Sequence, residues 1–181
     1  MGVRRVVTGH DAKGKAVFAS DVEVDPIRLA LAPGTEFCPL WGADHPLHFP
    51  DDGSKPDSSG YFPPLGGFRF GMFTLAPDVV AFSDEFDMEA AMGELDEKLP
   101  GLADHLEPNN PGVHTSATVD YEYIVSGRCV LELDDGEARE LGPGDTVIQN
   151  GTRHAWRNPF DEPCVIVFAL VGAHHDGISH D

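Results

Sequence analysis

The segment that decides the fold is residues 114–158, which begins with HTSATVDYEYIVSG and closes with GDTVIQNGTRHAWRN. In an extended strand, successive side chains alternate between the two faces of the sheet. The first run therefore places a polar series on one face: His114, Ser116, Thr118, Asp120 and Glu122. If the second run pairs in the same sheet, His154 is expected to lie beside this series. Two imidazoles and a carboxylate would then converge inside a barrel.

Short strand-like runs separated by turns continue from residue 121 to residue 172. Turn signals stand at residues 134–136 (DDG) and 142–144 (GPG), where glycine and proline favour tight reversals of the chain. This rhythm is typical of an all-β barrel or sandwich. We therefore predict a mainly all-β fold.

The two runs resemble the two signature motifs of the cupins, which are small β-barrel proteins of the jelly-roll type. The first motif is matched by His114, Ser116, Asp120 and Gly127. The second motif is matched by Gly144, Gln149, Gly151, His154 and Asn158. Ser116 stands where the family has its second histidine, and Gln149 stands where it has a proline. The resemblance covers residues 110–171, about a third of the chain, and implies a single cupin barrel.

Cupins as a group include metal-dependent dioxygenases, decarboxylases, isomerases, lyases and cyclases, together with members that only bind ligands. The resemblance therefore does not select a reaction, because one fold hosts many activities. Our first hypothesis is a divalent-metal-dependent enzyme acting on a small oxygenated organic substrate, aromatic or polyketide-like. The alternative is a metal-free small-molecule-binding or regulatory cupin without catalysis.

A metal site is predicted from His114, Asp120 and His154. Two histidines and one carboxylate leave coordination positions open for substrate or dioxygen. Nitrogen and oxygen ligands of this kind suit iron, manganese, zinc, nickel or cobalt, so the sequence does not select the ion. The alternative is a metal-free barrel in which both histidines make ordinary hydrogen bonds, and the replacement of the second histidine by Ser116 favours it.

Two residues near the predicted ligands are candidates for catalysis. Strand alternation turns Glu122 inward beside Asp120, where it can act as a general base or a fourth ligand, unless a bulge turns it to solvent. Gln149 can orient a substrate oxygen through its amide, or it is a turn residue only.

Three residues are candidates for substrate contact. Trp156 shares strand parity with His154 and can offer a flat face to an apolar or aromatic ligand, or simply pack in the core. Ser116 and Thr118 lie on the inward polar face and are expected to line the pocket. Tyr121 and Tyr123 fall on the opposite face and are expected to pack against an outer sheet.

Composition restricts the partners of this 181-residue chain. It carries 12 basic and 31 acidic residues, a formal net charge of -19, which repels nucleic acid and anionic membrane surfaces. The three cysteines are far apart and form no CxxC pair, which favours a reduced, cytoplasmic protein. No long apolar run predicts a membrane span or a signal peptide. We expect a small-molecule ligand and a homodimer.

Three regions are expected along the chain. Residues 1–31 are predicted to be a strand extension, with a β-hairpin formed by residues 3–7 and 15–24. Residues 32–172 are assigned to the barrel, with a long loop at 32–67, a strand at 68–76 and one helix that Ser83 or Asp84 caps and Pro100 ends. Residues 173–181 are predicted to be a disordered tail.

Overall fold

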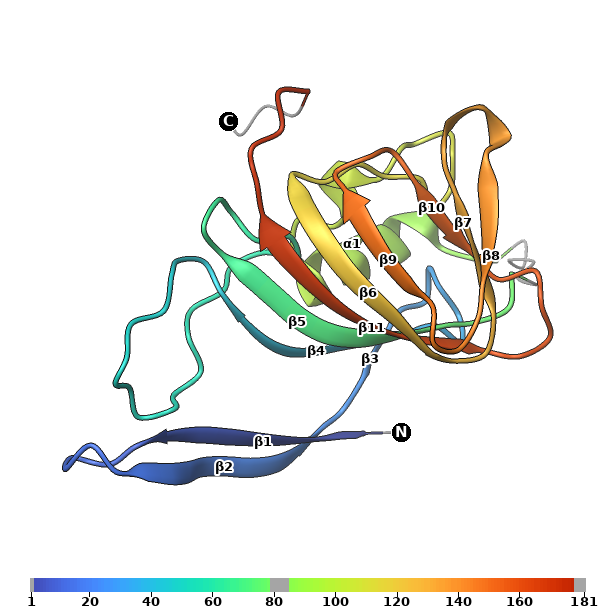
Figure 1. Cartoon of the computed structure of the whole chain (residues 1–181). Coiled ribbons are helices and arrows are strands. Elements are labelled where there is room, and N and C mark those ends of the chain that lie inside the picture. The colour runs from blue at the N-terminus through green and yellow to red at the C-terminus, as the bar shows by residue number, and fades with distance from the viewer. Residues whose placement is uncertain (1, 79–84, 178–181) are drawn as a thin grey trace.

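Antiparallel strands are the main regular elements of a computed structural model, which describes residues 2–78 and 85–177 (Figure 1). The strands are β1 (Val3–His10), β2 (Ala16–Val24), β3 (Ile27–Arg28), β4 (Glu36–Ala43), β5 (Phe68–Leu75), β6 (Thr118–Ser126), β7 (Cys129–Glu132), β8 (Ala138–Leu141), β9 (Thr146–Asn150), β10 (Ala155–Arg157) and β11 (Cys164–Gly172). The helical elements are α1 (Met88–Lys98) and two 3-10 turns, η1 (Ala103–His105) and η2 (Asp134–Gly136). The predicted all-β class is confirmed.

The barrel is built from two antiparallel sheets. The larger sheet has six strands in the order β3-β4-β5-β11-β6-β9, and the smaller sheet has three in the order β10-β7-β8. Between them lies an apolar cluster of Ile124, Cys129, Cys164 and Ile166, against which Trp156 packs. Because β11 pairs with both β5 and β6, it joins the N-terminal and C-terminal halves of the barrel.

The predicted N-terminal hairpin is present as β1 and β2, which form a sheet of their own. In Figure 1 it runs along the β3–β4 side of the larger sheet, away from β6 and β9. Few hydrogen bonds join it to the barrel region among the described residues: Arg5 donates to the carbonyl of Leu40, and the amide and ring Nδ1 of His10 donate to that of Asp51. The Cys38 thiol donates to the carbonyl of Val24 in β2.

The strand β4 lies inside the region that the sequence assigned to a long loop. It pairs with β5 along its length, and its Phe37 ring stacks on Phe73 with centroids 6.2 Å apart. The proline and glycine residues of region 32–67 argue against a strand when the sequence is read alone, and the strand is recognised only from its pairing with β5. The expectation of a continuous loop was therefore wrong for residues 36–43.

The predicted helix forms, but it begins later than the sequence suggested. Asp87 is its N-cap, and its side chain accepts a hydrogen bond from the amide of Ala90. The caps predicted at Ser83 and Asp84 lie outside the described residues. Leu95 and Leu99 join a buried cluster with Leu29 and Leu102. No helix in the described ranges is long and apolar enough to cross a membrane.

The described part of the predicted tail is anchored to the barrel. The amide of Ala173 donates to the carbonyl of Ala117, and the ring Nε2 of His175 donates to the carbonyl of Gly151 over 3.0 Å. The prediction of disorder is therefore wrong for residues 173–177, while residues 178–181 lie outside the described chain. A short histidine-rich sequence gave no sign of these specific contacts.

We predict that Leu95→Ala lowers the free energy of unfolding by about 2–5 kcal/mol, since it leaves a cavity in a fully buried cluster. Leu95 is 1% exposed, whereas Met92 on the same helix is 37% exposed. Met92→Ala is the matched control and should cost less than about 1 kcal/mol. Urea unfolding measures both, and equal losses would contradict the assigned core.

Candidate active site

The inward face of β6 carries the polar series at the centre of the candidate site. Thr118, Asp120 and Glu122 are all buried there, with 3%, 3% and 7% of their surface exposed. Asp120 lies opposite Gln149 on one side and Leu170 on the other, while Glu122 lies opposite Val147 and Phe168. The alternation of β6 therefore turns Glu122 inward, and no bulge directs it to solvent.

The two carboxyl groups form a buried and only partly hydrogen-bonded pair. Burial raises the pKa of Asp120 to about 6, an effect that a hydrogen bond from Thr118 partly offsets. Burial, together with the charge of Asp120, raises the pKa of Glu122 to about 8. Among the described residues, Asp120 Oδ1 and Glu122 Oε2 have no hydrogen-bond partner. Each carboxyl group thus presents one free oxygen to the interior.

His114 and His154 lie side by side. An isolated β-bridge joins their backbones, and their ring centroids are 4.2 Å apart. Burial and the neighbouring ring of His114 lower the pKa of His154 to about 4. Burial also lowers the pKa of His114. Both imidazoles are therefore neutral at physiological pH.

Backbone carbonyls fix the tautomers of both histidines. His114 Nδ1 lies 3.1 Å from the carbonyl of Gly112, and His154 Nδ1 lies 2.9 Å from that of Thr152. Because a carbonyl oxygen can only accept, each Nδ1 must carry the proton. Each neutral ring then has its lone pair on Nε2, which is the arrangement of a metal ligand or a proton acceptor.

The donor atoms suit a divalent cation chemically, but three of them are not gathered around one point. No group of three or more His, Cys, Asp or Glu side chains in residues 2–78 and 85–177 is placed to hold a metal ion. The predicted set of His114, Asp120 and His154 is thus present as a histidine pair and a separate carboxyl pair. His114 pairs with His154 in an isolated bridge outside β6, which begins at Thr118, whereas Asp120 lies within β6.

The other predicted site residues are engaged within the protein. Ser116 and Thr118 are hydrogen-bonded to each other over 2.7 Å. Gln149 uses its amide nitrogen and oxygen on Thr152, which makes it a turn-stabilising residue here. Trp156 meets Phe73 edge-on in the core cluster. Substrate contact by Ser116, Thr118 and Trp156, and catalysis by Gln149, stay predictions.

Three residues that the sequence analysis did not single out also reach the site. The ring of Phe62 lies 5.9 Å from that of His114 and 4.5 Å from that of His105. Burial raises the pKa of Tyr61, and the charges of Asp120 and Glu122 raise it further. The only sequence pattern that could have indicated them is the adjacent pair Tyr61-Phe62 within a polar, proline-rich loop. In the structure this loop places both aromatic side chains, called here the aromatic wall, next to the site.

Two antiparallel sheets packed face to face with a buried polar centre define a β-barrel of the jelly-roll class. Residues 106–170 match the Cupin domain family, and this span includes every member of the histidine and carboxyl pairs. This part of the chain is therefore a cupin domain, as its motifs implied.

Similarity to named proteins is strongest over a short segment. The chain is 43% identical over 49 residues to the oryzines biosynthesis cluster protein J of Aspergillus oryzae, which is 27% of either protein. It is 25% identical over 173 residues to the cupin-domain-containing oxidoreductase srdB of Neurospora crassa, covering 92% of this chain and 72% of that protein. The cupin domain of Schizosaccharomyces pombe Cnp3 aligns over 93% of this chain and 87% of that one, with 7% identity and a TM-score of 0.48.

We predict that the free energy of unfolding falls as pH rises from 6.5 to 8, and that Glu122→Gln removes most of this slope. The pKa of Glu122 is about 8 in the folded protein and near 4.5 in the unfolded chain. The stabilising contribution of this group is therefore complete below pH 4.5 and is lost as pH rises through about 8. The limiting slope is about 1.4 kcal/mol per pH unit.

Urea unfolding at several pH values measures this slope. The exposed Glu137→Gln is the matched control and should leave the slope unchanged. The range above pH 6.5 is chosen because the depressed pKa of His154 acts at lower pH. A wild-type slope that Glu122→Gln does not alter would contradict the raised pKa of Glu122.

Proposed function

We propose that this cupin is an enzyme that transfers protons to and from a small oxygenated organic substrate inside its barrel. The single observation that carries this proposal is the buried carboxyl pair, in which Asp120 Oδ1 and Glu122 Oε2 lack partners. Buried polar atoms are normally hydrogen-bonded, and a substrate oxygen or hydroxyl would satisfy both. A polar substrate therefore completes the interior.

The two carboxyl groups differ in protonation at neutral pH, which assigns them different roles. Glu122, with its pKa near 8, holds a proton that it can donate to a carbonyl or enolate oxygen. Asp120, with its pKa near 6, is mostly ionised and can accept a proton. Two neighbouring titratable groups whose pKa values are pushed apart are a common acid–base arrangement.

The histidine pair and the aromatic wall complete the proposed centre. His114 and His154 offer Nε2 lone pairs that can accept a hydrogen bond from a substrate hydroxyl. The ring of Phe62 packs beside His114 and favours an apolar or aromatic portion of the substrate. A small molecule with both parts, aromatic or polyketide-like, matches this lining.

The named relatives support an enzyme rather than a passive binder. SrdB and srdD of Neurospora crassa are each named a cupin-domain-containing oxidoreductase, and two phomopsin biosynthesis cluster proteins of Diaporthe leptostromiformis also match. The alignments to the phomopsin proteins span 24% of their length, about a quarter. These names agree with chemistry on small organic molecules.

We also propose that the site binds a divalent metal ion, because it contains nitrogen and oxygen atoms that can act as ligands. Nε2 of His114 and of His154 would hold it, and the free oxygen of Asp120 would be the third ligand. When bound, the ion would act as a Lewis acid toward a substrate oxygen. Because no three donors are gathered among the described residues, this arrangement requires a side-chain movement. A metal-free binding or regulatory cupin is the remaining alternative.

We predict that a thermal-shift screen of small acids, phenols and diketones finds ligands that stabilise the wild type and not Glu122→Ala. The substitution removes the carboxyl group that donates a hydrogen bond to the substrate oxygen, while binding of a ligand to the folded state raises Tm. Glu137→Ala should respond as the wild type does. Turnover of a stabilising ligand tests catalysis, and binding without turnover would favour the regulatory alternative.

Elemental analysis of protein purified from its native host tests the metal component. If it is present, the wild type retains about one equivalent of one metal and His154→Ala loses it. His48→Ala changes a loop histidine outside the site and should retain the metal. If the wild type contains no metal but its Tm still rises with the stabilising ligands, the metal proposal is wrong and the acid–base proposal stands.

A further inference from the structure

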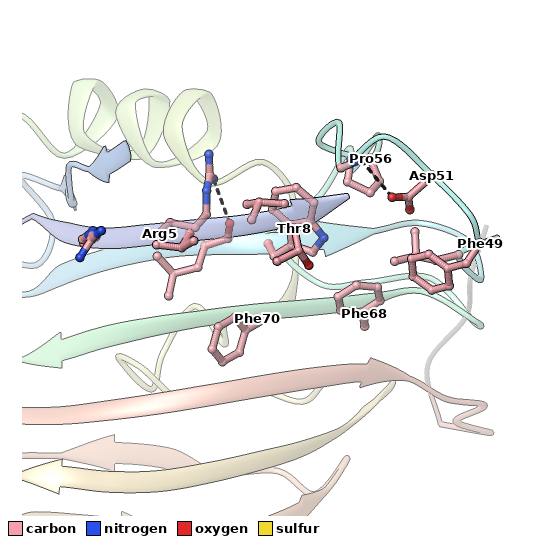
Figure 2. Close-up of a pocket in the computed structure, with 14 residues that line it drawn as sticks. Arg5, Thr8, Phe49, Asp51, Pro56, Phe68 and Phe70 are labelled. Carbon is pink, nitrogen blue, oxygen red and sulfur yellow. Dashed lines mark hydrogen bonds between the residues drawn. The ribbon is translucent and has the colours of Figure 1, made fainter. Parts of the chain in front are cut away.

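The N-terminal hairpin and the larger sheet enclose an open cavity of about 550 Å³. Figure 2 shows Phe68 and Phe70 of β5 on one wall, with Arg5 and Thr8 of the hairpin nearby. The loop between β4 and β5 adds Phe49 to the lining. Pockets that bind small molecules commonly measure about 300–1,000 Å³ and have mostly apolar and aromatic linings. The cavity beneath the hairpin therefore has the size and the lining of a small-molecule site.

This cavity lies on the opposite side of the larger sheet from the buried carboxyl pair. Phe70 lies opposite Ala169 of β11, which in turn lies opposite Tyr121 of β6. Residues that lie directly opposite one another share a face of the sheet, and Tyr121 is 49% exposed on the outer face. Asp120, its neighbour in β6, is buried on the inner face. The sheet therefore separates a ligand in the cavity from the proposed acid–base centre.

Arg5 differs from the other arginines, because no carboxylate among residues 2–78 and 85–177 forms an ion pair with it. Every other arginine of the chain forms such a pair. Carboxylates are not scarce, since the chain has 31 acidic and 12 basic residues. Nη1 of Arg5 donates to the carbonyl of Leu40 over 3.0 Å, whereas its Nε is buried and has no partner among the described residues. Because buried polar atoms are normally hydrogen-bonded, this Nε is suited to donate to an acceptor on a ligand.

The groups around Arg5 indicate the chemical class of the ligand. The guanidinium carbon lies 5.4 Å from the centre of the Trp41 ring, a cation–π contact that holds the charge beside an aromatic face. A planar guanidinium matches the geometry of a carboxylate. Phe68 and Phe70 add further aromatic faces, which favour a flat aromatic body. Asp51 also lines the cavity, and its charge disfavours a ligand with more than one acidic group.

We propose that the cavity beneath the hairpin is a second ligand site, which binds a small, flat aromatic monocarboxylate through Arg5. The carboxylate accepts hydrogen bonds from the guanidinium, and the aromatic ring packs against the phenylalanine side chains of β5. Nucleotides and other polyanions are disfavoured by the formal net charge of -19. The site does not depend on the proposed acid–base chemistry, because it shares no residue with the buried centre.

A ligand in this cavity also fastens the hairpin to the barrel. A two-stranded hairpin alone is at best marginally stable in water, and few hydrogen bonds join this one to the barrel region among the described residues. A ligand that contacts both the hairpin and β5 adds contacts between them, and it stabilises the state that binds it. Slower exchange of the hairpin amides therefore reports that the cavity is filled.

Isothermal titration calorimetry with 2-naphthoate as the probe tests the site. The wild type is expected to bind it, and Arg5→Gln should bind it at least about 10-fold more weakly, because the substitution removes a charge-assisted hydrogen bond. Arg139→Gln is the matched control, since it makes the same change at an exposed arginine outside the cavity, and its affinity should equal that of the wild type. 2-Naphthol lacks the carboxylate and should bind equally weakly to the wild type and to Arg5→Gln.

Glu122→Ala separates this site from the buried centre, and it should bind 2-naphthoate as the wild type does. Wild type that does not bind the probe at millimolar concentration would overturn the proposal, as would equal affinity of the wild type and Arg5→Gln. Binding that is lost in Glu122→Ala and kept in Arg5→Gln would place the probe in the buried centre. The cavity proposal would then be wrong, while the acid–base proposal would stand.

Hydrogen–deuterium exchange of the wild type gives a readout that needs no variant to fold. 2-Naphthoate should slow exchange several-fold in peptides that cover residues 3–10 and 47–56, which border the cavity. Peptides that cover residues 129–141 of the smaller sheet are the internal reference, with no change expected. Slower exchange confined to residues 114–124 would contradict the proposal. If higher protein concentration alone slows exchange in residues 3–10 and the probe adds nothing, a second copy of the chain fills the cavity and the proposal is wrong.

Discussion

The alternation of side chains along β6 is the constraint on which the rest of the structure depends. A period of two forces neighbouring residues to opposite faces, so placing Asp120 and Glu122 in the barrel necessarily places Tyr121 and Tyr123 outside it. A shift of register by one residue would expose both carboxyls and bury both tyrosines. One strand thus defines the internal centre and the external apolar face together.

Burial shifts the pKa of each group in the internal centre toward its neutral form, and no ion pair among the described residues involves these groups. Burial raises the pKa of both carboxyl groups and lowers that of both histidines, so desolvation acts in the same sense on all four. Such a centre costs stability, and a protein retains it when the groups serve binding or chemistry. This is why the centre, rather than the cavity beneath the hairpin, is the proposed site of catalysis.

Much of the fold was readable from local patterns. The hairpin, the helix and the strands after residue 118 follow from alternation, helical spacing and turn residues, which are properties of neighbours in sequence. The strand β4 was missed because its local composition indicates a loop, and only pairing with β5 makes it a strand. The helix cap was placed too early, because several acidic and hydroxyl side chains before α1 are equally good N-caps by type.

Strand parity, which is a property of neighbours in sequence, was enough to indicate which residues could face the interior. The meeting of His114 and His154 was expected only on the condition that their two runs pair, as the bridge between them shows. Tertiary structure alone decided how far apart the remaining donors lie. Among the described residues it gathers no three metal-binding side chains around one point, it engages Gln149 with Thr152, and it brings Tyr61 and Phe62 from a distant loop to the centre. Distances between segments depend on sheet curvature and loop packing, which no pattern of neighbours specifies.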